Sequence, residues 1–577
     1  MTVIPRRVET PDGVTLAVYE RGEPGRPTVV AVHGYPDNHA VWDAAADLLA
    51  EDFHVVSYDV RGAGESDKPG GVAAYRMPHL VADFLAVADA VSPDEPVHVL
   101  AHDWGSIQAW GALLDPSTAG RIASLSSISG PSLDYAGAWL RDLPRHPRSR
   151  LAQLARSYYI GLFQVPGLGE LAVRTGVLDR ITRLTSARHR SARAVVGEPP
   201  RSEADKLNGI ALYRANMLGA ATRPAPVATG VPVHVIVPRD DAFVSRQVAV
   251  DAPRRWVERL TVTDVAGGHW VVSQRPDVIA RLTREFIEGL PAGRPARGSA
   301  AQHRGDHAGR FVVVTGGGRG IGRATALEFA RKGADVLIAD IDDVAAKDTV
   351  SDLHELGVRA WAAHLDVSDV DAWERFALTV RDEHGVPDVL VNNAGIGMGG
   401  TFLRTSAADW GRIINVNLWS VIHGSRLFAA QMVERGQGGR IVNVASAAAF
   451  SPSLIYPAYA TTKAAVLMLT ECLTAELASE GIAVTAVCPG FIDSDISAST
   501  EHVGVDAETA AALRAHQVEA YHRRGYPPAK VARQLVAAAT ANAPLVVITP
   551  EAKVLRAVSR FAPGLGRRIA RIDLNRF

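Results

Sequence analysis

The sequence predicts two α/β domains in tandem, each with a mostly parallel sheet covered by helices. Three observations predict this fold class. The chain has 577 residues, whereas a single hydrophobic core stops growing at roughly 250–300 residues. Short apolar strands alternate with longer helical stretches in two separate series. Between the two series, residues 291–309 are rich in Pro, Gly, Ala and Arg and almost free of large apolar side chains, which predicts a flexible linker.

The composition is that of an ordinary globular protein, with 47% hydrophobic and 21% charged residues. A formal net charge of −1 gives no support to bulk nucleic-acid binding. Cys472 and Cys488 are the two cysteines, and because neither has metal-ligand spacing we expect no disulfide and no metal site. No apolar run approaches the ~20 residues of a spanning helix, and the first residues lack the apolar core of a secretory signal. We therefore expect a cytoplasmic protein.

The first domain is expected over residues 1–290. Its clearest strands are the apolar runs at 28–34, 54–62, 97–105, 231–238 and 260–268. Between 131 and about 228 the strand rhythm stops, and Trp, Tyr and Arg stand among the apolar residues of helical stretches. This interruption predicts an inserted helical cap.

The second domain is expected over residues 310–550, beginning with the strand FVVVT. The linker before it contains His303 and His307, whose spacing of four could suggest a metal site. Without helix-forming context we expect both to be solvated.

The tail, 551–577, carries seven basic residues against two acidic ones. Its apolar Val554, Leu555, Val558 and Phe561 recur at helical spacing, which predicts a basic amphipathic helix. One hypothesis is peripheral contact with an anionic membrane surface. Docking on the protein or on a partner subunit explains the pattern equally well.

The strongest local pattern of the first domain is the turn Ala101-His102-Asp103-Trp104-Gly105 after an apolar strand. Small residues at both ends permit a sharp strand-to-helix turn that exposes its central side chain. That side chain is the carboxylate of Asp103, and no G-x-S-x-G occurs in the chain, so a serine esterase is disfavoured. A carboxylate nucleophile forms an ester that must then be hydrolysed.

Hydrolysis of such an ester needs a base and a group that orients it. Asp241 follows the strand at 231–238, and His269 lies in a Gly-Gly-His-Trp turn after the last strand. The order nucleophile, acid, histidine is that of α/β-hydrolases. Asp240 competes for the role of the acid, but Asp241 is preferred from its place three residues past Pro238.

With these residues the first domain resembles the epoxide hydrolases, and the resemblance covers about 290 residues. His33-Gly34-Tyr35-Pro36 is similar to the family's oxyanion loop, and the resemblance implies that the amides of Tyr35 and Trp104 stabilise negative charge. The run Asp59–Ser66 is similar to a D-x-R-G-x-G-x-S turn that haloalkane dehalogenases share. Ala101 stands where the family has glycine, from which we expect only a slightly tighter turn.

The cap distinguishes between these two families. Epoxide hydrolases place two tyrosines over the nucleophile to protonate the oxirane oxygen, and Tyr159 and Tyr213 have settings that resemble them. Tyr158 is expected to serve in packing, and His102 in structure. Dehalogenase chemistry remains an alternative, as does a degenerate hydrolase domain that only binds.

In the second domain a glycine-rich run follows a strand and opens a helix, as binding of a dinucleotide pyrophosphate requires. Asp340 ends the next strand and is placed to accept the ribose hydroxyls, which favours NAD; Arg319 keeps NADP open. The cofactor-binding residues of this run are Gly316, Arg319, Gly320, Ile321 and Gly322.

Tyr459 and Lys463 supply acid–base chemistry, because residues four apart on a helix share one face. We expect the Lys463 ammonium, together with an oxidised nicotinamide, to lower the pKa of Tyr459 from its usual ~10.

With these motifs the second domain resembles the short-chain dehydrogenases/reductases, which implies a Rossmann-type doubly wound parallel sheet. In the whole chain this sheet would follow an α/β-hydrolase with a helical cap. The resemblance implies that Ser446 holds the substrate oxygen and that Asn417 anchors a water-linked proton path to the lysine. It also implies a homo-oligomer. The residues that it assigns to the cofactor are Asp366, Asn392, Ile492 and Ser494, with Tyr459 and Lys463.

The sequence thus predicts a bifunctional enzyme for lipophilic small molecules, in which an epoxide hydrolase precedes an NAD(P)-dependent alcohol/ketone oxidoreductase.

Overall fold

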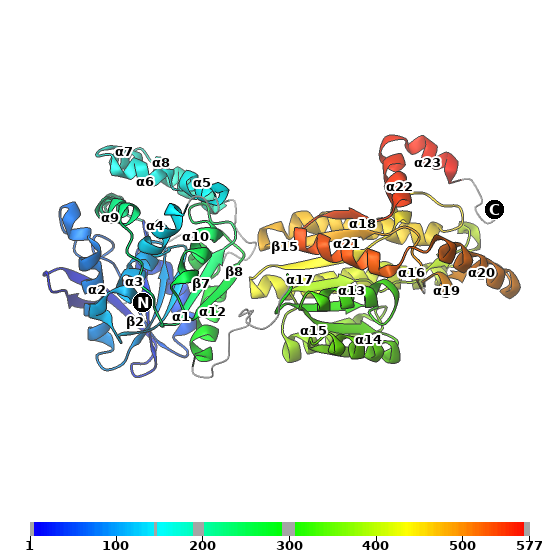
Figure 1. The fold of residues 1–577 in the computed structure, drawn as a ribbon, viewed down its shortest axis with the longest axis horizontal. Coiled ribbons are helices and arrows are strands. Elements are labelled where there is room, and N and C mark those ends of the chain that lie inside the picture. Colours follow the sequence, from blue (N-terminus) through cyan, green and yellow to red (C-terminus); the bar gives the residue numbers. More distant parts are fainter. Residues whose placement is uncertain (1–4, 143–146, 188–200, 291–305, 495, 571–577) are drawn as a thin grey trace. The chain divides into compact units, whose positions relative to one another are not determined.

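The computed structural model describes residues 5–142, 147–187, 201–290, 306–494 and 496–570 (Figure 1). The chain divides into two compact units, Met1–Ser299 and Ala300–Phe577. The two predicted domains correspond to these units, and the predicted fold class is confirmed for both.

The first unit contains an eight-stranded sheet of order β1-β2-β4-β3-β5-β6-β7-β8. Its first two strands pair antiparallel, and the strands from β4 to β8 are parallel to one another. The strands are β1 Arg6–Glu9, β2 Thr15–Arg21, β3 Thr28–Val32, β4 His54–Tyr58, β5 Val97–His102, β6 Ile122–Ile128, β7 Val233–Pro238 and β8 Leu260–Val265. The helices outside the cap are α1 Asp43–Leu49, α2 Met77–Val91, α3 Trp104–Leu114, α10 Arg246–Asp251, α11 Val271–Gln274 and α12 Pro276–Gly289.

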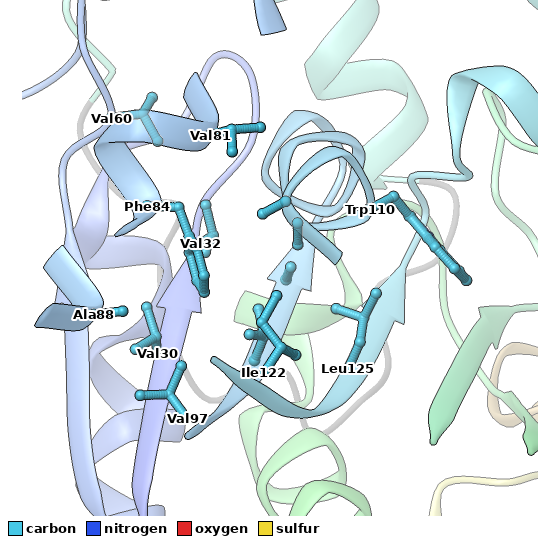
Figure 2. Close-up of a cluster of buried hydrophobic side chains, with 14 of the residues drawn as sticks. Val30, Val32, Val60, Val81, Phe84, Ala88, Val97, Trp110, Ile122 and Leu125 are labelled. Carbon is cyan, nitrogen blue, oxygen red and sulfur yellow. The ribbon is translucent and has the colours of Figure 1, made fainter. Parts of the chain in front are cut away.

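The core of this unit explains why its central strands are apolar throughout. All five residues of β3 are buried, because helices cover both faces of the sheet. Figure 2 shows Phe84 of α2 lying against Val32 of β3, with Trp110 of α3 beside Leu125 of β6. Each such fully buried side chain contributes about 1.5–3 kcal/mol. The packed sheet is therefore a rigid base for the loops at its carboxyl edge.

The described residues of the predicted cap form six helices between β6 and β7. They are α4 Leu133–Arg141, α5 Pro147–Arg156, α6 Tyr158–Gln164, α7 Leu168–Arg174, α8 Val177–Ala187 and α9 Glu203–Thr222. Apolar side chains of α6 and α9, among them Phe163 and Leu212, share one cluster with Tyr35 and Trp104 of the sheet's carboxyl edge. The cap is thus packed directly over the end of β5.

The second unit contains a seven-stranded, fully parallel sheet of order β11-β10-β9-β12-β14-β15-β17. This is the doubly wound order, whose reversal point lies between β9 and β12. The strands are β9 Phe311–Thr315, β10 Asp335–Asp340, β11 Ala360–His364, β12 Val389–Asn392, β14 Gly439–Val444, β15 Ile482–Cys488 and β17 Leu545–Val547. The helices packed around it include α13 Gly320–Arg331, α14 Asp343–Glu355, α15 Val370–His384, α16 Ala407–Ile414, α17 Ser420–Arg435, α18 Pro457–Glu476, α20 Ala507–Arg524 and α21 Pro528–Ala541.

One part of the predicted linker is wrong. His307 is 1% exposed, packs against Phe329 with ring centroids 5.0 Å apart, and contacts Thr540 Oγ1 at 2.9 Å through its Nε2. Burial lowers the pKa of His307 to about 4, so the ring is neutral and suited to this apolar site. Residues 306–309 therefore belong to the second unit, while His303 and the rest of 291–305 lie outside the described residues.

The predicted tail helix is present as α22 Pro550–Phe561, followed by α23 Pro563–Ile569. Residues 571–577 lie outside the described part of the chain. None of the helices in the described ranges combines the length and apolar character that crossing a membrane requires.

A buried ion pair fixes the turn after β4 and provides a test of the fold. The fully buried Arg61 guanidinium donates to Asp83 at 2.6 and 2.7 Å and also binds Asp12. Burial raises the pKa of Asp83 even beside this arginine. In Arg61→Met the Asp83 carboxylate loses its partner, so we expect the first unit to lose about 3–5 kcal/mol.

Denaturant unfolding of the full chain, followed through the transition of the first unit, measures this loss. Arg6→Met is the matched control, because the Arg6–Glu20 pair is partly exposed (49% and 29%) and such pairs contribute about 0–1 kcal/mol. A loss in Arg61→Met no larger than in the control would contradict the prediction.

Two candidate active sites

The turn after β5 presents Asp103 at the carboxyl edge of the first sheet. Asp103 has φ 50° and ψ −121°, a left-handed conformation that non-glycine residues rarely adopt. Close backbone packing holds it there, because a Cβ on Gly105 would lie 2.2 Å from Val32 O and a Cβ on Gly130 would lie 2.1 Å from Asp103 O. The predicted sharp turn is thus present.

The three residues predicted to act together lie in contact. His269 Nε2 is 3.5 Å from Asp103 Oδ2, and His269 Nδ1 is 3.1 Å from Asp241 Oδ2. Asp241 is 5% exposed, and its Oδ1 also accepts the amides of Phe243 and Val244. Asp240, the competing choice, is exposed. The geometry therefore favours Asp241 as the acid that orients His269.

The charges of this group are strongly coupled. Burial alone would lower the pKa of His269, but the carboxylates of Asp241 and Asp103 outweigh it and raise the pKa to about 10. Burial would likewise raise the pKa of Asp241, and the charge of His269 holds it below its ordinary value. At neutral pH the site holds an imidazolium between two carboxylates.

The predicted oxyanion loop contacts the carboxylate directly. The Tyr35 amide donates to Asp103 Oδ1 at 2.8 Å. Gly34 allows this approach, since a Cβ there would lie 2.5 Å from both Cβ and Oδ1 of Asp103. Trp104, the other predicted donor, is the first residue of α3, so its amide belongs to a helix N-terminus.

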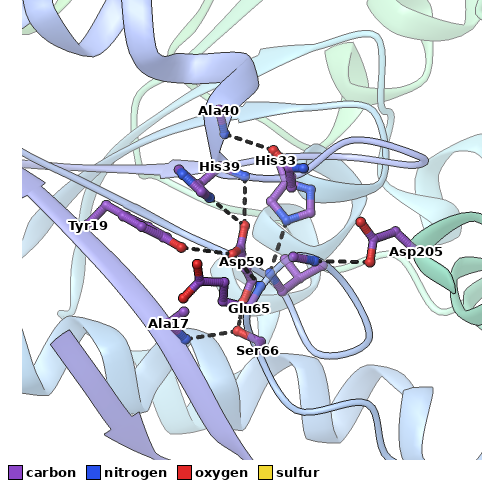
Figure 3. A network of polar contacts seen from close by, with 12 residues as sticks. Ala17, Tyr19, His33, His39, Ala40, Asp59, Glu65, Ser66 and Asp205 are labelled. Atoms are coloured by element: carbon purple, nitrogen blue, oxygen red, sulfur yellow. Dashed lines mark hydrogen bonds and ion pairs between the residues drawn. The ribbon is translucent and has the colours of Figure 1, made fainter. Parts of the chain in front are cut away.

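The turn Asp59–Ser66 supports the oxyanion loop through the polar network in Figure 3. Asp59 Oδ1 accepts both the amide and the ring Nδ1 of His39 at 2.8 Å. The Val60 amide donates to His33 Nε2 at 3.0 Å, and burial lowers the pKa of His33, so this ring nitrogen can accept. Ser66 Oγ donates to Asp59 O. The turn therefore fixes both ends of the segment that carries Tyr35.

A polar link that no motif predicts also joins the cap to the sheet. Arg201, before α9, contacts Asp37 Oδ1 at 2.7 Å and lies over the Trp270 ring at 5.0 Å. Trp270 Nε1 donates to the other Asp37 oxygen at 3.2 Å. The link joins the oxyanion loop, the residue after His269 and the cap. The adjacency of Asp37 to Pro36 was the only available signal.

The two cap tyrosines lie together near Asp103. Tyr159 of α6 and Tyr213 of α9 make an edge contact, with ring centroids 5.9 Å apart, and Tyr213 packs on Trp104 at 4.9 Å. Burial raises the pKa of both phenols above the ordinary value, and the negative charge of Asp103 adds to this effect. Both therefore keep their protons. Tyr158 is 61% exposed, and its ring makes an edge contact with that of Tyr159 at 6.1 Å, so it packs against the outside of this pair.

His102, beside the nucleophile, has the predicted structural role. Its Nε2 contacts the backbone oxygen of His269 at 2.8 Å. Phe243 was not predicted, but its ring lies 4.9 Å from His269 and 5.4 Å from Tyr159. Its ring therefore contacts both His269 and a cap tyrosine.

In the second unit the glycine-rich run forms a cradle without side chains between β9 and α13. Gly316 and Gly320 have φ of 60° and 54°, and a Cβ on Gly322 would lie 2.0 Å from Gly316 O. Asp340 Oδ2 accepts the Gly318 amide at 2.8 Å, which sets the carboxylate beside the loop. Backbone amides at a helix N-terminus and an acidic strand end fit the pyrophosphate and ribose of a nicotinamide dinucleotide.

The other predicted cofactor residues lie in different surroundings. Ser494 lies beside the cradle, since a Cβ on Gly320 would be 3.5 Å from its Cβ. Arg319 is largely exposed and pairs with Asp342. The Asp366 carboxylate accepts hydrogen bonds from Ser368. Ile321 is partly buried against the core cluster that contains the buried Ile492.

Asn392 requires a correction. Its side chain is 3% exposed and donates to Asn443 Oδ1 at 2.8 Å and to Ser425 Oγ at 3.1 Å, inside the sheet. The neighbouring Asn393 instead donates to Thr315 O and Gly316 O, and so braces the cradle. The side chain of Asn392 therefore positions strands and is not directed at a cofactor.

Tyr459 and Lys463 share one face of α18 as predicted, with Lys463 Nζ 5.9 Å from the Tyr459 ring centroid. Lys463 Nζ donates to Val444 O at 3.0 Å. Burial lowers the pKa of Lys463 to about 8 and raises the pKa of Tyr459, which a hydrogen bond with Ser446 only partly opposes. The lowered pKa predicted for Tyr459 is therefore not produced by these residues, because desolvation outweighs the hydrogen bond.

Asn417 lies in a π-helical turn, Asn415–Trp419, between α16 and α17. Its side chain accepts the Ile396 amide at 2.8 Å and donates to Ile396 O at 3.0 Å. Gly395 faces both predicted members of the proton path, because a Cβ there would lie 3.1 Å from Asn417 Oδ1 and 3.4 Å from Lys463 Nζ. The structure thus brings Asn417 and Lys463 to one place.

Comparisons with known proteins agree with this division. A family model of the alpha/beta hydrolase fold matches residues 27–276, and one of the short chain dehydrogenases matches residues 310–503. The chain is 42% identical to the probable oxidoreductase EphD of Mycobacterium tuberculosis, a match that covers 98% of each chain.

Two solved structures are similar to part of the chain. A short chain dehydrogenase/reductase from Burkholderia phymatum in complex with NAD is 28% identical, covering 45% of this chain and 96% of its own, with a TM-score of 0.42. An epoxide hydrolase from metagenomes of hot environments is 25% identical, covering 51% of this chain and 100% of its own, also with a TM-score of 0.42.

The coupled charges predict how His269 titrates. Its folded pKa lies above the ordinary 6.5, so this interaction stabilises the fold fully below pH 6.5, and its contribution is lost as the pH rises through about 10. Asp103→Asn removes one of the two carboxylates, and we expect the pKa of His269 to fall by at least about one unit.

Histidine-selective NMR titration of the full chain measures this pKa. Asp240→Asn is the matched control, since it removes an exposed neighbouring carboxylate and should leave the His269 titration unchanged. An equal shift in both variants, or none in Asp103→Asn, would show that Asp103 does not face the imidazole.

Proposed function

Because the chain belongs to the two-domain family of the probable oxidoreductase EphD, we propose that it hydrolyses epoxides at its first site and interconverts alcohols and ketones at its second. An α/β-hydrolase followed by a short-chain dehydrogenase fits a bifunctional enzyme. The observation that carries the first activity is the carboxylate nucleophile Asp103, held between His269 and two protonated cap phenols.

In the first step, we propose that an Asp103 oxygen attacks an oxirane carbon. A carbon–oxygen ester bond forms, the ring carbon–oxygen bond breaks, and its electron pair goes to the oxirane oxygen. Tyr159 or Tyr213 donates a proton to that oxygen. The raised pKa of both phenols supports this role, because an already ionised tyrosine could not protonate the leaving oxygen.

Ester hydrolysis follows from the same charges. Forming the ester removes the negative charge of Asp103, so His269 keeps only Asp241 as a counter-charge and its pKa falls. His269 can then take a proton from water as the water oxygen attacks the ester carbonyl. The Tyr35 amide, which donates to Asp103 Oδ1, would stabilise the negative charge on the carbonyl oxygen. The bond between the carbonyl carbon and the ester oxygen then breaks, and the departing diol oxygen takes the proton held by His269. The second proton of the water returns to the phenolate, so the products are a diol, the restored carboxylate and the protonated tyrosine.

Haloalkane dehalogenation is the alternative for this site. It would need donors for a departing halide, and it gains nothing from two phenols that hold protons over the nucleophile. A domain that only binds would not require the strained conformation of Asp103 or its contact with His269. The cap tyrosines therefore favour the epoxide.

At the second site, we propose that a bound nicotinamide supplies or accepts the hydride. Gly316, Gly320, Gly322 and Asp340 would hold the dinucleotide. Tyr459 keeps its proton at neutral pH and can donate it to a carbonyl oxygen that Ser446 positions. Lys463 would return a proton to Tyr459, and Asn417 would anchor the water-linked path that resupplies the lysine from solvent. For a chain with both activities we further propose that the substrates are lipophilic molecules of one class.

Two variants test the division of labour. Asp103→Asn should reduce diol formation from model epoxides to background while sparing NADH formation from secondary alcohols. Tyr459→Phe should spare diol formation and reduce NADH formation by about 10²–10⁴-fold, the usual contribution of a general acid. Each variant is the other's control for folding. Diol formation at the wild-type rate in Asp103→Asn, or halide release from haloalkanes without any diol formation, would refute the epoxide proposal.

The preference for NAD is tested at Asp340. Its carboxylate beside the glycine loop should repel a 2′-phosphate, so Asp340→Ser should raise the ratio of kcat/KM for NADP over NAD by about tenfold, or about 1.4 kcal/mol. Asp343→Ser is the matched control, because Asp343 is exposed and pairs with His364. A ratio unchanged by Asp340→Ser, or a wild type that favours NADP, would assign the preference to other residues such as Arg319.

A further inference from the structure

The outer face of α22 carries a row of exposed apolar side chains. Val554 is 61% exposed and Phe561 is 80% exposed, and the exposed Ala557 lies between them. Their spacing of three and four residues places them on one face of the helix. Leu565 of α23, 50% exposed, follows them. Single exposed apolar residues are ordinary, but a row along one helix forms a surface.

A row of basic side chains lies beside this apolar row. Lys553, Arg556 and Arg560 have the same spacing and are exposed, and the Arg560 guanidinium lies 6.0 Å from the Phe561 ring centroid. Glu551 is the single acidic residue among residues 550–570, and it pairs with Arg524 of α20. The outer face therefore has no negative charge from its own helix.

The inner side of α22 is fixed to the second active site. Ala552 is fully buried, and the helix packs on the turn Ala447–Phe450, which directly follows Ser446. Glu551 Oε1 accepts the Phe491 amide at 3.1 Å, which ties the helix to the segment after β15. Figure 1 shows α22 and α23 projecting from the body of their unit. The helix is held in place while its outer face points to solvent.

We propose that this face of α22 docks the dehydrogenase unit on an anionic lipid bilayer, with the apolar row inserted and the basic row on the headgroups. A row of apolar residues flanked by Lys and Arg is the pattern of helices that lie in a membrane interface. A second copy of the chain fits less well, because a two-fold contact through this face would bring together two copies of the same basic row. The docking surface does not depend on the reactions proposed above.

Vesicle flotation of the full chain tests the proposal. Wild type should float with vesicles that contain about a third phosphatidylserine, and not with pure phosphatidylcholine, and high salt should weaken the association. Lys553→Gln/Arg556→Gln/Arg560→Gln should lower partitioning into the vesicles roughly 100-fold. Each basic residue near an anionic surface contributes about 1 kcal/mol, and a tenfold change corresponds to about 1.4 kcal/mol. Val554→Ser/Phe561→Ser should also release the protein.

The control is Arg331→Gln/Arg375→Gln/Arg381→Gln, which removes the same charge from exposed arginines of α13 and α15 and should float like wild type. A circular-dichroism spectrum and a melting temperature like those of wild type show that each variant is folded. Equal partitioning of wild type and the two α22 variants would overturn the proposal. So would absence of vesicle binding together with a loss of oligomers in Val554→Ser/Phe561→Ser by light scattering, which would assign the face to a second copy.

Discussion

The buried imidazolium of His269 between two carboxylates is the interaction on which the first unit depends. Each of its three charges would be costly to bury alone, and each is tolerated because the others lie within hydrogen-bonding or ion-pair distance. The rest of the unit provides that geometry. The parallel sheet delivers its carboxyl ends to one edge, glycines let the loops approach, and side chains of the cap pack over that edge. Because the surroundings are apolar, a change of charge on Asp103 acts strongly on His269.

The second unit uses burial in the opposite way. No carboxylate contributes to the pKa shift of Tyr459 or of Lys463. Desolvation favours the neutral form of each side chain. The tyrosine is thereby held as a proton donor, and a lysine with a pKa of about 8 can exchange protons near physiological pH. One unit thus prepares its chemistry with paired charges, and the other with groups that are neutral or nearly so.

The parts of the sites that sequence could predict are those encoded in short segments. The turn around Asp103 and the glycine run at Gly316 both join a strand to a helix within a few residues, so their shape follows from local sterics. Asp241 and His269 were found from their order along the chain, since the carboxyl ends of parallel strands meet at one edge. The alternation of strands and helices likewise predicted both sheets and the extent of the cap.

What could not be predicted depends on contacts between distant segments. Arg201 meets Asp37 and Trp270 only after the cap has folded over the sheet. The linker composition concealed His307, whose partners Phe329 and Thr540 come from two other helices. A motif places the backbone of Asn392 but does not say to which side the amide turns. Helical spacing brought Lys463 to Tyr459, but spacing carries no information about desolvation, which decides the sign of the shift.

The chemistry of the two proposed reactions orders them if one molecule passes through both sites. An epoxide has no hydroxyl or ketone at the strained carbons, so the dehydrogenase has nothing to act on there until the ring is opened. Hydrolysis yields adjacent hydroxyls, and oxidation of one of them gives a hydroxyketone, on which a carboxylate nucleophile has no strained carbon left to attack. The first reaction therefore removes the substrate of its own site and creates a substrate for the second, so the order does not depend on how the two units are arranged in space.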